Sequence, residues 1–175
     1  MKDKSIIPTS REKVMRENDF IVSKTDLTGR ITYGNRIFIE FSGYSEEELL
    51  GAQHNIIRHP DMPRAAFALA WSLIKSEQEF FGFVKNMAKD GSFYWVFTHI
   101  TPSYDERGKM VGYLSVRRKP NPAVLPTLAG IYKQMLEIEN RAGAQKAIEA
   151  STKFLLNFLA EKGTSYEELV LALQG

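Results

Sequence analysis

The sequence contains no cysteine among its 175 residues. This absence excludes disulfide bonds, zinc or iron–sulfur sites built on thiolates, and cysteine nucleophiles. A chain without disulfides fits a reducing compartment, so we expect a cytoplasmic protein. The sequence also has no apolar run long enough to span a bilayer, and the residues after Met1 form no apolar signal-peptide core. We therefore expect contact with a membrane only through a partner protein.

A strong charge bias is missing as well. The formal net charge is +2, with 23 Lys and Arg residues against 21 Asp and Glu residues. Nucleic-acid-binding domains usually carry a concentrated basic surface, so we expect no nucleic-acid partner. The sequence has no phosphate-binding loop, no kinase motif and no G-x-G-x-x-G nicotinamide motif. A small flavoprotein reductase is therefore the least favoured hypothesis, and we do not expect an enzyme.

Alternating apolar residues and turn signals predict five strands in two groups. The first group is a hairpin with strands over residues 20–24 and 31–33. The second group has strands over residues 80–87, 93–101 and 110–117. Asp90-Gly91 provides the first hairpin turn of that group, and Pro102 is expected to end its second strand.

Helix signals fill the interval between the two groups of strands. Capping patterns predict short helices over residues 35–43 and 45–51. Asp61 as a cap, followed by Pro63 in the first turn, predicts the start of a longer helix. The apolar face of that helix is formed by Phe67, Ala70, Trp71 and Ile74.

The chain therefore divides into three parts: residues 1–18, 19–120 and 121–175. The first part is expected to be an N-terminal helical cap, because Thr9-x-x-Glu12 has the pattern of a capping box. The second part holds the predicted sheet. The third part is expected to be a helical tail that begins at Asn121-Pro122.

Glycines divide the tail into helices with apolar stripes. Gly143 is expected to separate the first two helices, and Thr164-x-x-Glu167 is expected to cap a last short one. The apolar stripes must be buried somewhere. We expect a dimerisation or receptor-docking element, and the alternative is an intramolecular cap on the chain's own sheet.

Several segments carry a resemblance to a known family. They are Thr25-Asp26-Leu27, Ile31 to Asn35, Phe41 to Tyr44, His54 to Pro63, Ala65 to Phe67, Trp71, Val84 to Asn86, Asp90-Gly91, Tyr94 to Val96 and Gly112-Tyr113. Over residues 18 to 120 the sequence resembles the flavin-binding PAS domains of bacterial aerotaxis receptors. The resemblance implies an α+β PAS fold, a five-stranded antiparallel sheet with short helices on one face, here followed by the C-terminal helical extension.

The same resemblance implies FAD as the cofactor and a role as a redox or oxygen sensor in aerotaxis and chemotaxis. Full aerotaxis receptors continue into a membrane anchor and a signalling coiled coil, and this sequence shows neither. It is similar in this respect to the stand-alone PAS subunit of a two-protein energy-taxis system. We therefore expect a homodimer that signals to a separate methyl-accepting, chemotaxis-type transmembrane receptor, which could recruit it to the inner membrane.

The resemblance carries over Arg58, His59 and Asp61 as flavin-binding positions. Arginine offers a fixed fork of donors, and a helix N-terminus favours anions. The alternative is that Asp61 only caps its helix and Arg58 only pairs with a carboxylate. Trp71 is predicted to contact the flavin ring as well as to pack in the core.

Three further residues complete the predicted site. Asn86 could bond the pyrimidine edge of a flavin, or it could face solvent before the next turn. Asn35 could line the pocket, or it could only cap a helix. Tyr94 and Trp95 must point to opposite faces of their strand, and Trp95 is included in the predicted site.

Two other ligand classes are alternatives to the flavin. A metal site at His54, His59 and Asp61 has no familiar ligand spacing. A haem-binding PAS domain would need an axial ligand such as His59 or His99. A cofactor-free PAS interaction module, with a pocket filled by core side chains, is the remaining alternative. The adduct chemistry of flavin photoreceptors is excluded because it needs a cysteine.

Overall fold

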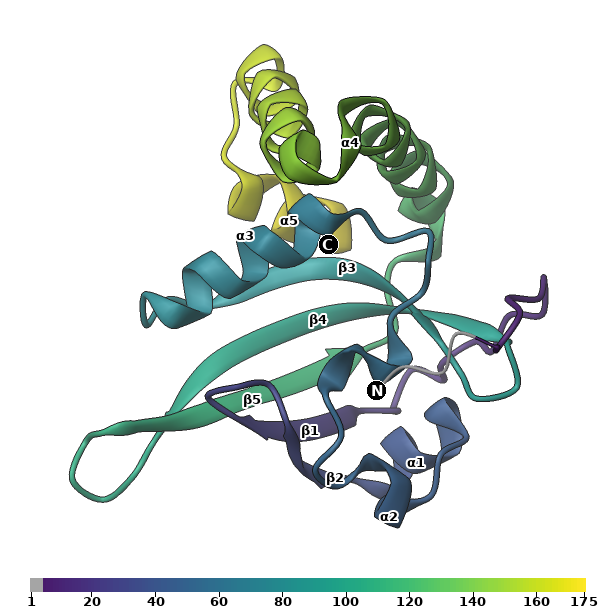
Figure 1. Cartoon of the computed structure of the whole chain (residues 1–175), viewed down its shortest axis with the longest axis vertical. Helices are drawn as coiled ribbons and strands as arrows, with labels where there is room; N and C mark the ends of the chain where they lie inside the picture. Colours follow the sequence, from purple (N-terminus) through teal and green to yellow (C-terminus); the bar gives the residue numbers. More distant parts are fainter. Residues whose placement is uncertain (1–4) are drawn as a thin grey trace.

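The computed structural model describes residues 5–175 and contains one five-stranded antiparallel sheet. Its strands are β1 (Ile21–Asp26), β2 (Ile31–Gly34), β3 (Phe80–Met87), β4 (Phe93–Tyr104) and β5 (Met110–Arg118). They lie in the order β2-β1-β5-β4-β3, so the chain returns to pair its last strand with its first (Figure 1). The predicted number of strands is confirmed, and each predicted strand overlaps an observed one.

Strand β4 is longer than predicted because Pro102 does not end it. Pro102 lies inside β4 and pairs with Tyr113 of β5. Strand β3 pairs with β4 only as far as Ile100, so beyond that residue β4 has no neighbour on its β3 side. A proline is tolerated at such an edge because no partner strand needs its missing N–H.

Helices α1 (Arg36–Ser42), α2 (Glu46–Leu49), η1 (His54–Ile57) and α3 (Arg64–Lys75) lie between β2 and β3 in the chain. The predicted caps of α1 and α2 are confirmed. Asn35 accepts the Phe38 N–H, and Ser45 forms a capping box with Glu48. These local bonds need only residues three positions apart, which is why the sequence alone predicts them.

The predicted N-cap residue of α3 is wrong. Pro63, and not Asp61, precedes the first helical residue, and no side chain of this segment caps it. Two backbone N–H groups of the first turn, those of Arg64 and Ala65, instead donate to Glu139 of the tail at 2.9 and 3.0 Å. The cap of α3 therefore comes from a residue 74 to 75 positions further along the chain.

The prediction of an N-terminal helix over residues 9–18 is also wrong, and residues 1–4 of the predicted helical cap lie outside the described residues. This segment is extended and runs beside β4, with the Lys13 N–H donating to the Phe93 carbonyl at 2.7 Å. The Thr9 N–H donates to the Gly91 carbonyl at 2.8 Å. Pairing with the β3–β4 hairpin satisfies some of the backbone groups that a helix would have satisfied.

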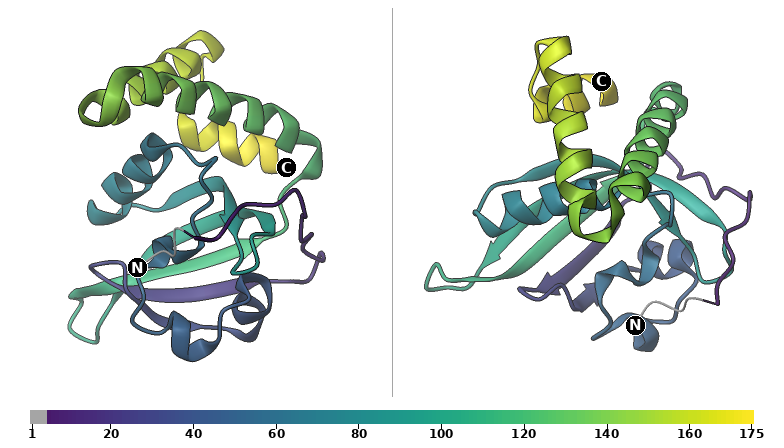
Figure 2. Two further views of the ribbon diagram at one scale, coloured as in Figure 1. Left: turned by 45° about the vertical axis from the view of Figure 1, so that its right-hand side comes forward. Right: turned by 45° about the horizontal axis from the view of Figure 1, so that its top comes forward.

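The tail consists of η2 (Pro122–Val124), α4 (Leu125–Lys162) and α5 (Tyr166–Gln174). The predicted break at Gly143 is confirmed, since φ of 75° and ψ of 166° interrupt α4 there. The two parts of α4 turn back beside each other above α3 and β3 (Figures 1 and 2). The predicted cap of the last helix is one residue off: Ser165, not Thr164, forms the capping box, with Glu168.

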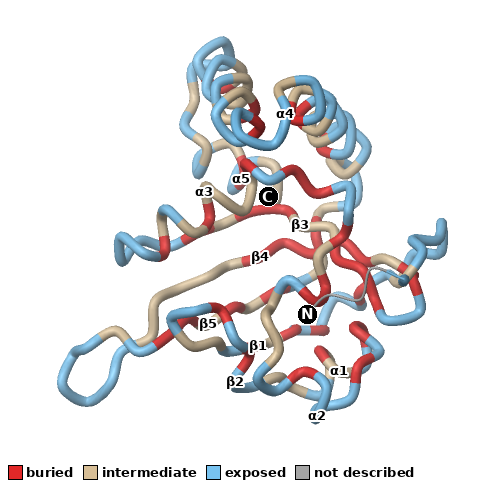
Figure 3. Tube along the Cα trace, viewed as in Figure 1, coloured by how far each residue is buried: buried red, intermediate tan, exposed pale blue. Residues whose placement is uncertain are grey.

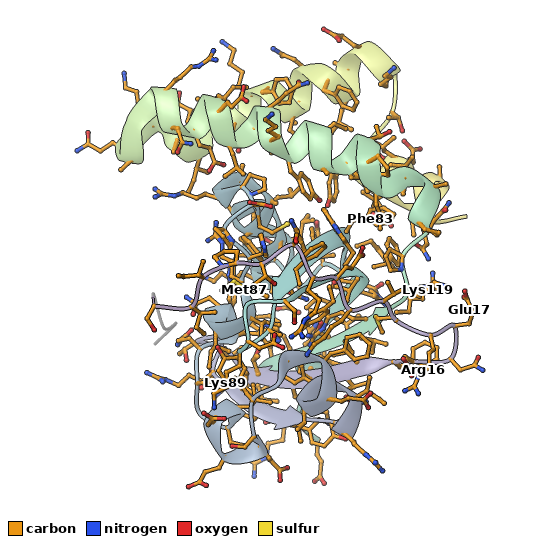
Figure 4. All side chains as sticks on the ribbon, turned by 90° about the vertical axis from the view of Figure 1, so that its right-hand side faces the viewer. Arg16, Glu17, Phe83, Met87, Lys89 and Lys119 are labelled. Carbon is orange, nitrogen blue, oxygen red and sulfur yellow. The ribbon has the colours of Figure 1, made fainter. Side chains whose placement is uncertain are left out.

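The sheet is buried on both faces where the tail covers β3 and β4 (Figure 3). One face packs against α1, α2 and η1 through a cluster that includes Phe38, Tyr94 and Val96. The other face carries Phe83 of β3, which points toward the tail (Figure 4). Phe83 belongs to a cluster with Trp95, Phe97, Leu128 and Val170. The tail therefore caps the chain's own sheet, which is the intramolecular alternative, and dimerisation and receptor docking stay predictions.

Candidate functional site

A cavity of about 470 Å³ lies between α3 and the sheet. One wall is the apolar face of α3, which contributes Phe67, Ala70, Trp71 and Ile74 at helical spacings of three and four. Tyr113 of β5 lies on the sheet side, and its ring meets the Trp71 ring edge-on at 5.6 Å between centroids. The volume falls in the range of small-molecule sites, about 300–1,000 Å³.

The inner end of the cavity is polar. Its lining there includes Ser23 of β1, Thr98 of β4 and Ser115 and Arg117 of β5. All four are buried, and they share this end because alternate residues of neighbouring strands point to one face. The Thr98 hydroxyl and the Arg117 Nη1 have no hydrogen-bond partner among the described residues. Buried polar groups are normally paired, so these two donors are available to a ligand.

His54 from η1 closes this polar end. Its Nε2 lies 3.0 Å from the Ser23 hydroxyl and 3.3 Å from the Arg117 Nη2, and its ring stacks on Phe38. Burial, together with the Arg117 cation, lowers the pKa of His54 from 6.5 to about 3. His54 is therefore neutral at physiological pH.

Three of the predicted site residues line this cavity: Arg58, Trp71 and Asn86. Arg58 lies at its edge, where its Nη2 donates to the Met62 carbonyl at 3.0 Å and its guanidinium packs on the Phe67 ring. Burial lowers the pKa of Arg58, against the opposing influence of Glu139. Asn86 is buried on β3 and does not face solvent. The structure thus brings the arginine, the tryptophan and the amide to one cavity.

The other four predicted residues lie elsewhere. Asn35 caps α1, and its side chain also accepts the Val22 N–H and donates to the Phe20 carbonyl. His59 is buried against Phe93, and its Nδ1 accepts the Asp61 N–H. Asp61 is exposed and pairs with Lys85 at 2.6 Å.

Trp95 lies on the tail side of the sheet, where it stacks on Tyr132 at 6.1 Å between centroids. Strand alternation places Tyr94, and not Trp95, on the face that bears the cavity. His99 shares the tail side with Trp95: it stacks on Phe81 and bonds Glu79. Neither His59 nor His99, the two residues considered as haem ligands, lines the cavity.

Sequence reasoning missed the polar end of the cavity. The missed residues are Ser23, His54 as a cavity residue, Thr98, Ser115 and Arg117. A signal was present in the last strand, since Arg117 and Arg118 are adjacent and strand alternation must turn one of them inward. An arginine on the inner face of a strand is expensive to bury, which marks it as a candidate site residue.

The fold and the cavity define the class of protein. A five-stranded antiparallel sheet in the order β2-β1-β5-β4-β3, with helices and a cavity on one face, is the PAS arrangement. Residues 31–117 match the family model described as "PAS fold". The chain therefore contains a PAS domain, and the predicted fold class is confirmed.

Among curated proteins, the chain is 38% identical over 127 residues to the aerotaxis receptor of Escherichia coli, a match that covers 73% of the chain and 25% of the receptor. It is 32% identical over 97 residues to a nitrogen fixation regulatory protein of Klebsiella pneumoniae, which covers 55% of the chain and 20% of that protein. The chain thus spans a quarter or less of these relatives.

Solved structures support the fold alone. A light-oxygen-voltage domain studied with a flavin analogue superposes with a TM-score of 0.55 at 24% identity, over 62% of this chain and 82% of that one. The light-state structure of the Aureochrome1 light-oxygen-voltage domain has a TM-score of 0.54 at 20% identity, over 70% and 93%. Within residues 5–175, no helix is both long and apolar enough to cross a bilayer.

Proposed function

We propose that this PAS domain binds FAD in the cavity beneath α3 and acts as a redox or oxygen sensor in aerotaxis or chemotaxis. The observation that carries the proposal is the cavity itself, with aromatic walls and unpartnered donors at its inner end. The 38% identity to an aerotaxis receptor supports the sensory role.

The residues present fit a flavin. Trp71 and Tyr113 provide aromatic surface for a planar ring. The Thr98 hydroxyl and the Arg117 Nη1 are donors without partners, and Asn86 offers both a donor and an acceptor. When bound, the flavin would supply reversible electron uptake. Besides Arg117, the cationic residues that line the cavity are Arg58 and Arg64, and we assign them to its phosphate groups.

The signal would leave the site through α3. Trp71 lies on α3, and the first turn of α3 is held by Glu139 of the tail. A change at the cavity that moves α3 therefore also acts on the tail. Such a switch requires two conformations of the protein whose free energies differ by only a few kcal/mol. We propose that the recipient is a separate methyl-accepting, chemotaxis-type transmembrane receptor, that the protein works as a cytoplasmic homodimer, and that it reaches the inner membrane through this partner.

An absorption spectrum of the purified protein, recorded before and after dithionite, tests the proposal. We expect a two-banded yellow spectrum that bleaches on reduction, and FAD as the mass of the released chromophore. A sharp Soret band would instead identify haem. A colourless protein that does not take up added FAD would leave a cofactor-free interaction module.

The two tryptophans of the chain provide a matched pair of variants. Trp71→Leu removes a cavity wall and is expected to weaken FAD binding by about two- to tenfold, since a ring contact contributes about 0.5–1.5 kcal/mol beyond its buried area. Trp95→Leu changes the tail side of the sheet and is expected to keep the bound flavin. Equal losses in both variants, with circular dichroism showing that both are folded, would argue against the cavity as the site.

A further inference from the structure

Arg117 is a buried guanidinium that faces the cavity from β5, and only 2% of the residue is exposed. All its hydrogen-bond partners are neutral. Its Nε donates to the Ser115 hydroxyl at 3.1 Å, and its Nη2 donates to the Ser23 hydroxyl. The same Nη2 lies 3.3 Å from the neutral ring of His54. The guanidinium also packs on the Phe38 ring, 4.9 Å from its centroid.

No carboxylate of residues 5–175 forms an ion pair with the Arg117 cation. Burial lowers its pKa to about 10, which still leaves it charged at neutral pH. Burying a charge without a counter-charge is unfavourable, and buried charges are normally paired. The missing negative charge is therefore expected to come from what the cavity binds.

We propose that Arg117 compensates negative charge on the bound flavin, so that the cavity binds the reduced ring more tightly than the oxidised ring. This inference rests on the proposed function. Two electrons from a donor, dithionite in the assay, together with one proton at N5, leave one negative charge on the pyrimidine side of the ring. Arg117 supplies the matching positive charge, and the unpartnered Thr98 hydroxyl supplies a further donor.

A preference for the reduced ring raises the midpoint potential of the bound flavin. Each tenfold difference in affinity between the two redox states corresponds to about 30 mV for a two-electron couple. Attraction between opposite charges is strong at this site because little water screens it. Arg117 would thereby set the redox range in which the sensor switches.

The test is a dithionite titration of the FAD-loaded full chain, with a reference dye to report the potential. Arg117→Met is expected to bind oxidised FAD but to lose at least a tenfold preference for the reduced ring, which lowers the midpoint potential by about 30 mV or more. The midpoint potential of FAD bound to Arg117→Met should also fall more steeply as the pH rises, because the reduced ring takes up a second proton when the arginine is absent. Arg117→Lys keeps the charge and should stay close to the wild-type value.

Arg118→Met is the matched control, since Arg118 is the exposed neighbour on the same strand and packs on Phe97 at the tail side of the sheet. It should leave the potential unchanged. Arg117→Gln serves if the methionine variant does not fold, and the same lowering is expected. A yellow wild-type protein whose Met and Gln variants keep the wild-type potential would overturn this inference alone. A wild-type protein that binds no flavin would overturn the proposed function with it.

Discussion

At the scale of single residues, the fold shifts the protonation of His54 well away from that of a free histidine. His54 lies between the Phe38 ring and the polar end of the cavity. Burial is the main cause of its lowered pKa, about 3 against 6.5, and the Arg117 cation adds to it. A neutral His54 can form a hydrogen bond with the Ser23 hydroxyl and adds no second positive charge beside Arg117.

This lowered pKa predicts how stability depends on pH. Between about pH 6.5 and pH 3 the unfolded chain binds a proton at His54 that the folded chain does not. The free energy of unfolding must therefore fall as the pH falls through this window, with a limiting slope of about 1.4 kcal/mol per pH unit. Urea unfolding at about pH 7 and about pH 5 should show this loss, because most carboxylates stay ionised there.

The variant that isolates this contribution is His54→Gln, which keeps a polar side chain but cannot take up the proton. Its unfolding free energy should change clearly less between the two pH values than that of the wild type. Equal losses in both proteins would show that His54 is not the group responsible, and that the proton is taken up elsewhere in the unfolded chain.

The candidate site could be predicted from the sequence only in part, and the reason is found at this scale. Trp71 could be placed on the cavity because helical spacing puts it on the apolar face of α3. Asn35 could not be assigned, since the same amide suits a cap and a pocket. Trp95 was placed wrongly relative to the cavity, because alternation fixes that it opposes Tyr94 but does not fix which of the two faces inward.

At the scale of helices and strands, prediction succeeds where the determining contacts are local. The hairpin turns and the caps of α1 and α2 each depend on residues a few positions apart, so their signals lie within one segment. The extended segment at residues 9–18 depends instead on pairing with the β3–β4 hairpin, which no local pattern shows. The same holds for α3, whose cap, Glu139, lies on another helix.

Glu139 is expected to stabilise the contact between α3 and the tail. Only 5% of the residue is exposed, and each carboxylate oxygen accepts one N–H of the first turn of α3. Glu139→Gln leaves one acceptor oxygen and places an N–H₂ group against a donor, so it should lower the free energy of unfolding by about 1–3 kcal/mol. Urea unfolding measures this loss.

Glu137→Gln is the matched control for this cap. Glu137 is half-exposed and lies 4.0 Å from Arg141 on the same helix, so its loss should cost no more than about 0.5 kcal/mol. Hydrogen exchange should also show faster exchange at the start of α3 in Glu139→Gln and not in Glu137→Gln. Equal effects of the two substitutions would contradict the cap.

At the scale of the whole molecule, the course of α4 decides where the tail buries its apolar residues. A straight helix over Leu125–Lys162 would extend about 57 Å, at 1.5 Å per residue, and could not fold back over the domain. The break at Gly143 turns the second part of α4 back over the domain. Ile148, in this second part, lines the cavity. The same break therefore gives the tail a direct contact with the candidate site.

Replacing two glycines of α4 with alanine tests this arrangement, because the two substitutions are expected to change the stability of the protein in opposite directions. Gly143 has a φ of 75° and ψ of 166°, a conformation that only glycine adopts readily, so Gly143→Ala should destabilise the protein by about 1–3 kcal/mol. Gly130 lies exposed in the regular part of α4, and an added Cβ would meet nothing within 4 Å. Gly130→Ala should therefore stabilise the protein by about 0.5–1 kcal/mol. Thermal and urea unfolding of both variants provide the comparison.

If both alanine variants are stabilised alike, α4 continues as one helix through residue 143 in solution, and its apolar stripes must be buried between two copies of the chain. Sedimentation of the Gly143→Ala variant separates the two arrangements. If the tail stays folded back on its own sheet, Gly143→Ala is destabilised but keeps the association state of the wild type, because the tail still covers that face of the sheet. If the tail is released as one long helix, the cluster around Phe83 and Trp95 becomes exposed. That exposed apolar surface favours dimerisation, which would be seen as a larger sedimenting species.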